Sequence, residues 1–301
     1  MKLSTGAMLA LSLTLGRPVL AQQQDFSKVE VKSEKVAEGV YMLQGAGGNI
    51  GLSVGPDAAF LIDDEYAPLT PKIKAAVAAL TDKPIRFVLN THWHGDHTGG
   101  NKDMGEAGSL IVAHENVRRR MSTEQFIAAF NMREPAAPPK ALPVVTFTDA
   151  VTFHLNGDEI HAFHVPPAHT DGDSVVHFRK ANVIHAGDLF FNGMYPFIDL
   201  DTGGSVGGMI GGADRMLAIA GDQTRIIPGH GPLGNKADLK AFRDMLAATH
   251  DRVAALVKAG KTLEQVTAAA PTAEFDAKWG QGFLKPAQFV AILYKDATAG
   301  K

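Results

Sequence analysis

Short apolar runs separated by turn residues dominate the first third of the sequence. The runs are β-branched or alternate with polar positions, and Gly55-Pro56-Asp57 marks one of the turns between them. Alternating runs bounded by glycine and proline are typical of strands. The pattern predicts antiparallel strands at residues 29–31, 40–43, 50–54 and 58–62.

Helical spacing appears next, before another strand. Ala, Lys and Leu at residues 71–80 predict a helix that ends before Lys83-Pro84, and the apolar run 85–89 predicts the strand that follows. Asn156-Gly157-Asp158 is typical of a hairpin turn. Further strands are expected at residues 109–113, 144–147, 151–155 and 159–165.

The segment between residues 118 and 143 combines two patterns. Residues 118–130 predict a helix, whereas residues 133–143 are too rich in proline for a helix or a central strand. The second part is therefore a predicted loop. The sequence leaves open whether this loop covers a site or is a plain surface connection.

Strands and helices alternate through the second half. An amphipathic helix with Leu239 and Val257 on its apolar face should end at Gly260, and Thr262 with Gln265 fits a capping box for the next helix. Gly203 to Gly208 predicts a flexible loop entering a helix, because no Gly-Lys-Ser/Thr follows that would suit a phosphate. Strands are expected at 174–178, 182–185 and 225–227, and helices at 209–220 and 286–294. Together the elements predict an α/β protein, an αβ/βα sandwich of two mixed β-sheets flanked by helices.

The amino-acid composition excludes several kinds of partner and ligand. The 301 residues are 45% hydrophobic and 20% charged with a net charge of −3, so the chain can build a core but has no basic footprint for nucleic acid. The absence of cysteine excludes disulfides and thiolate metal ligands. Length alone permits one or two domains, and the spread of the motifs below favours a single domain over residues 22–301.

The first residues resemble a secretory leader. Lys2 precedes an apolar stretch from Ala7 to Leu15, and small residues around Ala21 suit cleavage before Gln22. The stretch is well short of the roughly 20 residues that span a bilayer. We expect a signal peptide at 1–21 and a mature protein in the periplasm or secreted, without membrane attachment. An uncleaved anchor is the alternative, which Arg17 in the boundary region keeps open.

Four metal-capable side chains crowd into six positions directly after the apolar run 85–89. Alternate residues of an extended chain share a face, so His92 and His94 can point the same way, and a turn at Gly95 can bring Asp96 and His97 beside them. Three imidazoles and one carboxylate suit Zn²⁺ better than Mg²⁺ or Ca²⁺. The sequence therefore predicts a zinc site at the mouth of a strand.

This His-x-His-x-Asp-His run resembles the signature of the metallo-β-lactamase superfamily. That family also has an upstream strand ending in Asp, here Asp63, and then a His, an Asp and a last His, here His169, Asp188 and His230. The resemblance covers nearly all of the chain after the leader. It implies the metallo-β-lactamase fold and a dinuclear metal site.

The resemblance implies how the ligands divide between two Zn²⁺ ions, with iron or manganese left open as the metal. The first set is His92, His94 and His169; the second is Asp96, His97 and His230. Asp188 would bridge the ions, and Asp96 would be the catalytic carboxylate of the second set. A hydroxide between two ions would serve as nucleophile near neutral pH.

Several other residues are expected around the ligands. Asp63 is predicted as a strand-end hydrogen-bond acceptor, and His164 and His185 lie close enough in sequence to proposed ligands to support them. The substrate wall is expected to include Trp93, Phe191, Asn192 and Tyr195.

Substrate is the least determined feature. Secreted β-lactamases of the family usually carry Cys or Ser at the Asp188 position and many have a nearby Lys, whereas Asp188 and the apolar residues 189–197 resemble lactonases and glyoxalase II. Export favours a β-lactam or another foreign small molecule. We expect an exported hydrolase that opens an amide or ester bond of a β-lactam, lactone or related ester. An iron-dependent persulfide dioxygenase and a non-catalytic metal-binding accessory protein are the alternatives, and the oligomeric state is open.

Overall fold

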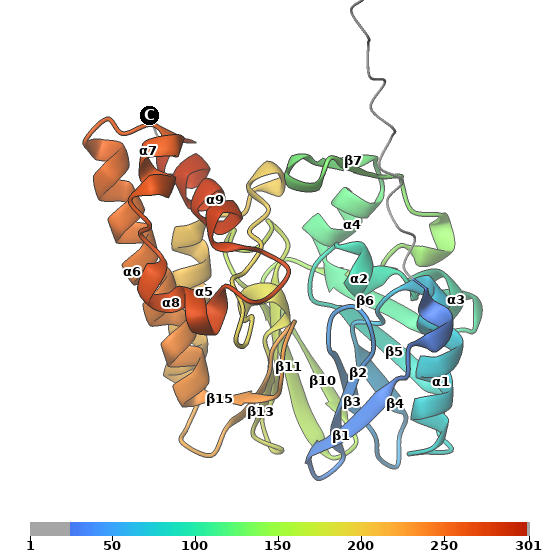
Figure 1. Cartoon of the computed structure of the whole chain (residues 1–301). Coiled ribbons are helices and arrows are strands. Elements are labelled where there is room, and N and C mark those ends of the chain that lie inside the picture. The colour runs from blue at the N-terminus through green and yellow to red at the C-terminus, as the bar shows by residue number, and fades with distance from the viewer. Residues whose placement is uncertain (1–24, 300–301) are drawn as a thin grey trace, which may run out of the picture.

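Two β-sheets face each other and carry helices on their outer faces in the computed structural model, which describes residues 25–299 (Figure 1). Helices α1 and α3 cover one sheet, and α5 and α6 cover the other (Figure 1). The predicted αβ/βα sandwich is confirmed. The predicted signal peptide at 1–21 lies outside the described residues, and no helix within them is long and apolar enough to cross a membrane.

The first sheet has seven strands in the order β1-β2-β3-β4-β5-β6-β9. Strands β2, β3 and β4 pair antiparallel, as predicted. Strand β1 pairs antiparallel with β2, whereas β4, β5, β6 and β9 run parallel. Its strands are β1 (Lys32–Ala37), β2 (Val40–Gln44), β3 (Ile50–Ser53), β4 (Ala59–Ile62), β5 (Ile85–Asn90), β6 (Leu110–His114) and β9 (Val145–Phe147).

The first predicted strand is wrong in position. Residues 29–31 pair with no strand, because the Val29 carbonyl accepts a hydrogen bond from the Lys72 ammonium at 2.6 Å while Val29 and Val31 pack on the outer core beside α1. The edge strand begins at Lys32 instead.

The second sheet has six strands in the order β10-β11-β12-β13-β14-β15. All pairs are antiparallel except β13 with β14. The predicted Asn156-Gly157 turn joins β10 to β11 with φ values of 54° and 74°. Asn and Gly suit this turn because they adopt the left-handed backbone conformation more readily than other residues. The strands are β10 (Ala150–Leu155), β11 (Asp158–His164), β12 (Ser174–Phe178), β13 (Val183–His185), β14 (Arg225–Ile227) and β15 (Gly234–Asn235).

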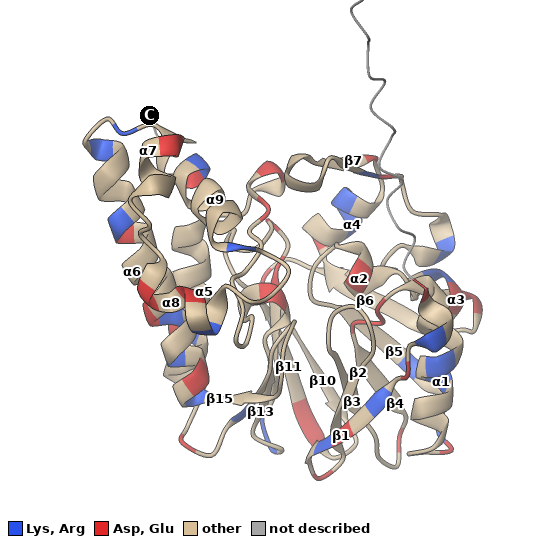
Figure 2. Ribbon diagram, viewed as in Figure 1, with Lys and Arg blue, Asp and Glu red and all other residues tan. Residues whose placement is uncertain are grey.

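A shared apolar core joins the two sheets. Phe60 and Leu89 of the first sheet belong to the same buried cluster as Val176 and Phe178 of the second. Both inner faces are thus hydrophobic, and Figure 2 shows charged residues concentrated on helices such as α1 and α6 while the sheets are mostly uncharged. Burial of these faces against each other fixes the strand ends that carry the site.

Most of the predicted helices are present. The capping box of Thr262 and Gln265 opens α7 as expected, but α3 and α8 were not predicted and α9 runs beyond Tyr294. The helices are α1 (Thr70–Ala78), α2 (Gly95–Thr98), α3 (Asn101–Glu106), α4 (Glu115–Met121), α5 (Val206–Ile219), α6 (Lys236–Lys258), α7 (Leu263–Ala268), α8 (Ala273–Trp279) and α9 (Pro286–Ala299).

The predicted helix at 118–130 is also wrong beyond Met121. The Gln125 side-chain amide donates a hydrogen bond to the Arg120 carbonyl at 3.0 Å, which closes the end of α4. A hairpin of β7 (Gln125–Ile127) and β8 (Met132–Glu134) follows, and it turns at Asn131 with a φ of 49°. The hairpin buries Ile127 and leaves its turn exposed.

Candidate metal centre

The His-rich segment begins where β5 ends at Asn90. The side chains of Asn90 and Asn101 exchange two hydrogen bonds of 3.0 and 2.8 Å, which hold the segment against α3. His92 to His94 leave the strand, and the short helix α2 then turns the chain so that Asp96 and His97 follow on the same side. The local geometry matches the predicted turn at Gly95.

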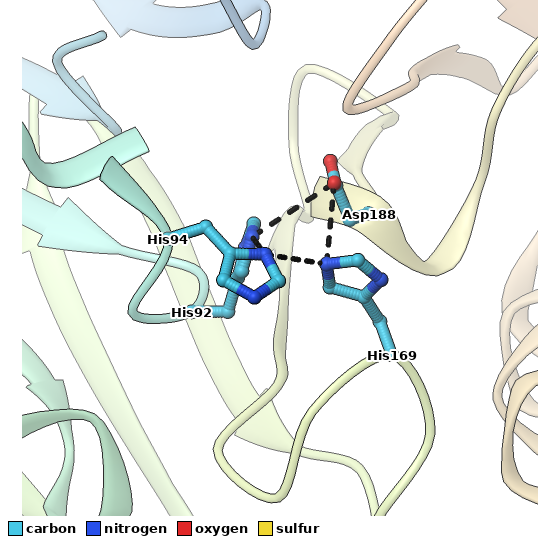
Figure 3. A group of neighbouring side chains, drawn as sticks. All are labelled: His92, His94, His169 and Asp188. Carbon is cyan, nitrogen blue, oxygen red and sulfur yellow. Dashed lines mark hydrogen bonds and ion pairs between the residues drawn. The ribbon is translucent and has the colours of Figure 1, made fainter. Parts of the chain in front are cut away.

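The first group consists of His92, His94, His169 and Asp188 (Figure 3). The Nδ1 atom of His94 lies 3.2 Å from His92 Nε2 and 2.9 Å from His169 Nε2. Asp188 Oδ2 lies 3.3 Å from His169 Nε2. All four side chains are buried.

The second group consists of Asp96, His97 and His230. His230 Nε2 lies 3.3 Å from Asp96 Oδ2 and 3.4 Å from His97 Nε2. Asp188 faces this group as well, because its Oδ1 lies 3.1 Å from His97 Nε2 and its Oδ2 lies 3.4 Å from His230 Nε2. The structure therefore brings all seven predicted ligands together and places Asp188 between the two groups.

The outer ring nitrogens show which atoms are free to bind a metal ion. His94 Nε2 lies 3.0 Å from Asp199, His169 Nδ1 lies 2.8 Å from the Phe197 carbonyl, and His97 Nδ1 lies 2.8 Å from Asp63. Carboxylates and carbonyls only accept hydrogen bonds, so these nitrogens carry the protons. The inner nitrogens of His94 and His169 then present lone pairs to one another.

Facing lone pairs need a cation between them. Asp188 Oδ1 is buried and accepts no hydrogen bond although His97 Nε2 is close, which is expected if both atoms are metal ligands. The two groups are thus able to hold metal ions, and imidazole with carboxylate is a donor set that suits zinc.

The charges of the site point the same way. Burial, reinforced by neighbouring His97, holds the pKa of His92 well below its ordinary value, and burial lowers the pKa of His169 to about 4, so both rings are neutral. Burial opposes protonation of His230 too, but the carboxylates of Asp188 and Asp96 raise its pKa to about 10. A proton on His230 thus takes the place that a metal ion would fill.

Of the three predicted supporting residues, Asp63 and His185 border the site. Asp63 accepts hydrogen bonds from the Thr91 amide and hydroxyl, both at 2.7 Å, besides its contact with His97. His185 supports the chain before Asp188, because its Nδ1 accepts a hydrogen bond from the Gly187 amide at 3.2 Å.

The prediction for His164 is wrong. Its ring stacks on His114 with centroids 3.8 Å apart, and its Nδ1 contacts only the backbone carbonyl of Asp173. The Asp173 side chain does support His169, since its carboxylate accepts hydrogen bonds from the His169 and Thr170 amides at 2.7 and 2.9 Å.

Asp199 and Thr91 are absent from the predicted set. Asp199 is buried and holds His94, and Thr91 links His92 to Asp63 through its hydroxyl, which lies 3.1 Å from His92 Nδ1. The run Phe197-Ile198-Asp199 repeats the apolar-then-aspartate pattern of residues 60–63, and this signal could have identified Asp199.

A cavity of about 420 Å³ opens on the two groups. It is lined by Ala46, Tyr66, His94, Gly95, Asp96, Ile127, Phe130, Met132, Glu134, Asp188, Phe191, Phe197, His230 and Phe283. Phe191 is the one predicted wall residue among them, and its ring stacks on His230 at a centroid distance of 5.1 Å.

The other three predicted wall residues do not line this cavity. Trp93 is buried in the core and donates to the Thr202 hydroxyl at 3.3 Å. Asn192 binds the Pro232 carbonyl, and Tyr195 is fully buried with its hydroxyl 2.7 Å from Asp276. Trp93 still contacts the outer side of His94, with ring centroids 4.6 Å apart, but none of the three side chains lines the metal cavity.

The proline-rich loop contributes little cover. Glu134, at its start, lines the metal cavity, whereas residues 135–138 line an adjoining cavity of about 350 Å³. Both cavities are walled by Gly95 and Glu134.

A sandwich of two mixed sheets with paired His and Asp groups at its strand ends defines a class of α/β metalloproteins. Residues 44–252 match the model of the metallo-beta-lactamase superfamily. The chain belongs to this superfamily, as the sequence motif predicts.

Known proteins resemble different parts of the chain. A hydroxyacylglutathione hydrolase of Erythrobacter litoralis is 30% identical over 36% of this chain and 35% of its own length. A metallo-beta-lactamase from Pontibacter korlensis is 19% identical over 72% of this chain and 99% of that one, with a TM-score of 0.59. A sec-alkylsulfatase from Pseudomonas sp. is 19% identical over 88% of this chain and 50% of that one, with a TM-score of 0.64. The two structural likenesses establish the fold, and the chain spans about a third of the length of the first relative.

Proposed function

We propose that this chain is an exported hydrolase that uses two zinc ions to open an ester, lactone or amide bond of a small molecule. The single observation that carries the proposal is the set of outer acceptors, which turns the inner nitrogens of His94, His97 and His169 toward one another and toward Asp188. Both sheets contribute to this set. We therefore propose one catalytic domain over residues 22–301.

Each group of side chains would hold one ion. His92, His94 and His169 would bind the first, Asp96, His97 and His230 the second, and Asp188 both. Zinc ions bound here would supply a hydroxide near neutral pH and polarise the bond under attack.

The protein's own residues prepare the site for that chemistry. Asp199 and Asp63 fix the orientation of His94 and His97, so the ligands need no reorganisation on binding. Phe191 covers one face of His230 and, with Phe197, keeps that wall apolar. An apolar wall lowers the local dielectric and strengthens the electrostatic interactions at the scissile bond.

Hydrolysis is supported over oxygen chemistry by the donors of the first group. Its three imidazoles exceed the two-His-one-carboxylate set of iron oxygenases, and the names of the relatives are those of hydrolases. Metal analysis separates the alternatives. Protein purified without added metal is expected to contain about two zinc per chain, whereas one iron would favour the persulfide dioxygenase and no metal the accessory protein.

The bond is identified by turnover of a matched panel. Wild-type protein loaded with zinc is compared on an uncharged lactone, an uncharged aryl ester and the β-lactam nitrocefin, with kcat/KM as the measure. Hydrolysis of at least one that is lost on chelation and restored by zinc is expected. Failure to hydrolyse any of the three with full zinc occupancy would refute this part of the proposal.

The proposed export has its own test. We expect the mature chain to begin at Gln22, because small residues precede it and the apolar stretch before them is short. Mass measurement of the protein from its native host, after separation of periplasm and cytoplasm, decides this. An intact Met1 on a cytoplasmic protein would contradict it.

A further inference from the structure

We propose that Glu134 determines the charge selectivity of this site: it disfavours substrates that carry an anionic group beside the scissile bond and favours uncharged ones. The proposal rests on the proposed hydrolase function. It concerns a residue of the β7–β8 hairpin, outside the metal-binding groups.

Glu134 is the last residue of β8, and its side chain lines the cavity. Its Oε1 would lie 3.8 Å from a Cβ atom placed on Gly95, directly beside His94 and Asp96. The side chain is half-buried, and within residues 25–299 its carboxylate has no hydrogen-bond or ion-pair partner. It is therefore free to act on whatever enters the cavity.

The charges that line the cavity make Glu134 distinctive. Apart from the proposed ligands His94, Asp96, Asp188 and His230, it is the one carboxylic acid among the lining residues, and none of the lining residues is Lys or Arg. The remaining wall is largely aromatic and aliphatic. A substrate group that does not contact the metal ions therefore meets an apolar surface, the neutral hydroxyl of Tyr66 or this carboxylate.

The nearest cations among the lining residues lie beyond Glu134. Lys102 and Arg120 line the adjoining cavity, which shares Gly95 and Glu134 with the metal cavity. Arg120 is already bound to Asp171 at 2.7 Å, and Lys102 is more than half exposed. Apart from the metal ions themselves, an anionic substituent on the substrate finds no Lys or Arg among the residues that line the metal cavity, and a carboxylate near Glu134 is repelled at low local dielectric.

The selectivity is tested by a pair of unreactive fluorescent probes that differ by one sulfonate. N-phenyl-1-naphthylamine is uncharged, and 8-anilino-1-naphthalenesulfonate is its anionic relative. Both are titrated into zinc-loaded wild type and into the Glu134→Gln and Glu134→Lys variants. We expect the ratio of the two dissociation constants to shift toward the anion by about tenfold in Glu134→Gln, and further in Glu134→Lys.

A matched control separates a local effect from a change in net charge. Glu34 is exposed on the edge strand β1 and, among the described residues, its side chain has no partner, so Glu34→Gln and Glu34→Lys make the same charge changes elsewhere. These variants should leave the ratio within about twofold of wild type. An unchanged ratio in Glu134→Gln, or an equal shift in the Glu34 variants, would overturn the proposal.

Turnover supplies the second reading. The ratio of kcat/KM for an uncharged aryl ester and for the same ester with a carboxylate on its acyl group should fall by about tenfold in Glu134→Gln. If Glu134→Lys fails to fold, as judged by circular dichroism, the near-isosteric Gln variant alone decides. If the ester, the lactone and the β-lactam all go unhydrolysed, the proposed function fails, but the probe titration still tests Glu134.

Discussion

Asp188 is the side chain on which both metal-binding groups depend. It is buried, its two oxygens face His97 on one side and His169 on the other, and its Oδ1 accepts no hydrogen bond. Burial alone would raise its pKa, but the positive charge of His230 and His97 outweighs burial and holds the pKa well below its ordinary value. The carboxylate is therefore ionised and available to two cations.

We predict that Asp188→Ala lowers both metal content and rate. Loss of the shared carboxylate leaves the two ions without their common ligand, so zinc per chain should fall below that of wild type and kcat/KM by at least ~100-fold. Elemental analysis and turnover of the best substrate measure the two effects. Asp214→Ala, which removes an exposed carboxylate paired with Arg243, serves as control. Wild-type zinc and rate in Asp188→Ala would exclude Asp188 as a ligand.

Asp63 gives a prediction about stability. It is fully buried and accepts hydrogen bonds from the Thr91 amide and hydroxyl and from His97. The Asp63→Ala substitution therefore leaves several buried donors without an acceptor. We expect the free energy of unfolding to fall by about 2–4 kcal/mol. The Asp63→Asn variant should lose less of its free energy of unfolding, because Asn keeps one acceptor oxygen and tolerates the left-handed φ of 65°. Urea denaturation in a chelator separates this effect from metal binding, and equal stability of wild type and Asp63→Ala would contradict it.

At the scale of elements, most of the metal-binding side chains lie in the loops that connect strands and helices, and not in the strands themselves. Helix α5 illustrates how tightly it packs on the loop before His169. A Cβ on Gly208 would lie 1.8 Å from the Pro167 carbonyl oxygen, whereas one on Gly211 meets nothing within 4 Å. The first glycine is required by a close approach of two backbones, and the second only lowers helix propensity.

This difference predicts opposite effects of the same substitution. Gly211→Ala should raise the free energy of unfolding by about 0.5–1 kcal/mol, because alanine loses less conformational entropy in a helix. Gly208→Ala should lower it by about 1–3 kcal/mol, since the helix must move from the Pro167 carbonyl. Thermal unfolding of both variants gives the comparison. Two changes of the same sign would show that α5 does not pack as described.

At the scale of the whole molecule, metal binding joins the two sheets. The first group takes His92 from the loop after β5 in the first sheet and His169 from the loop before β12 in the second. Ions bound between them would stabilise only the folded state, because the unfolded chain does not bring these residues together.

Chelation should therefore destabilise the protein. Zinc at a free concentration 100-fold above its Kd is expected to contribute about 2.7 kcal/mol per site, which EDTA removes. The melting temperature should fall in EDTA and return when zinc is added, while magnesium should not restore it. A melting temperature that stays the same while elemental analysis shows the zinc removed would contradict the coupling of metal and fold.

The sequence by itself determined the parts that depend on local pattern. Alternating apolar runs predicted most of the strands, and the Asn156-Gly157 turn and the capping box at Thr262 predicted how two elements join or begin, since these features depend on neighbouring residues only. The crowded residues 92–97 predicted metal donors for the same reason. His169, Asp188 and His230 were found through the family motif and not through spacing.

Only the tertiary structure decided which distant side chains meet. Asp199 reaches His94 across 105 positions, and the apolar residues before it can mark a buried aspartate but cannot tell which histidine it contacts. Trp93 and Tyr195 were expected at the cavity but are buried, because an aromatic side chain packs wherever apolar neighbours surround it. The β7–β8 hairpin replaced a predicted helix because the Gln125 side chain ends α4 and because Ile127 is buried in a core to which both sheets contribute.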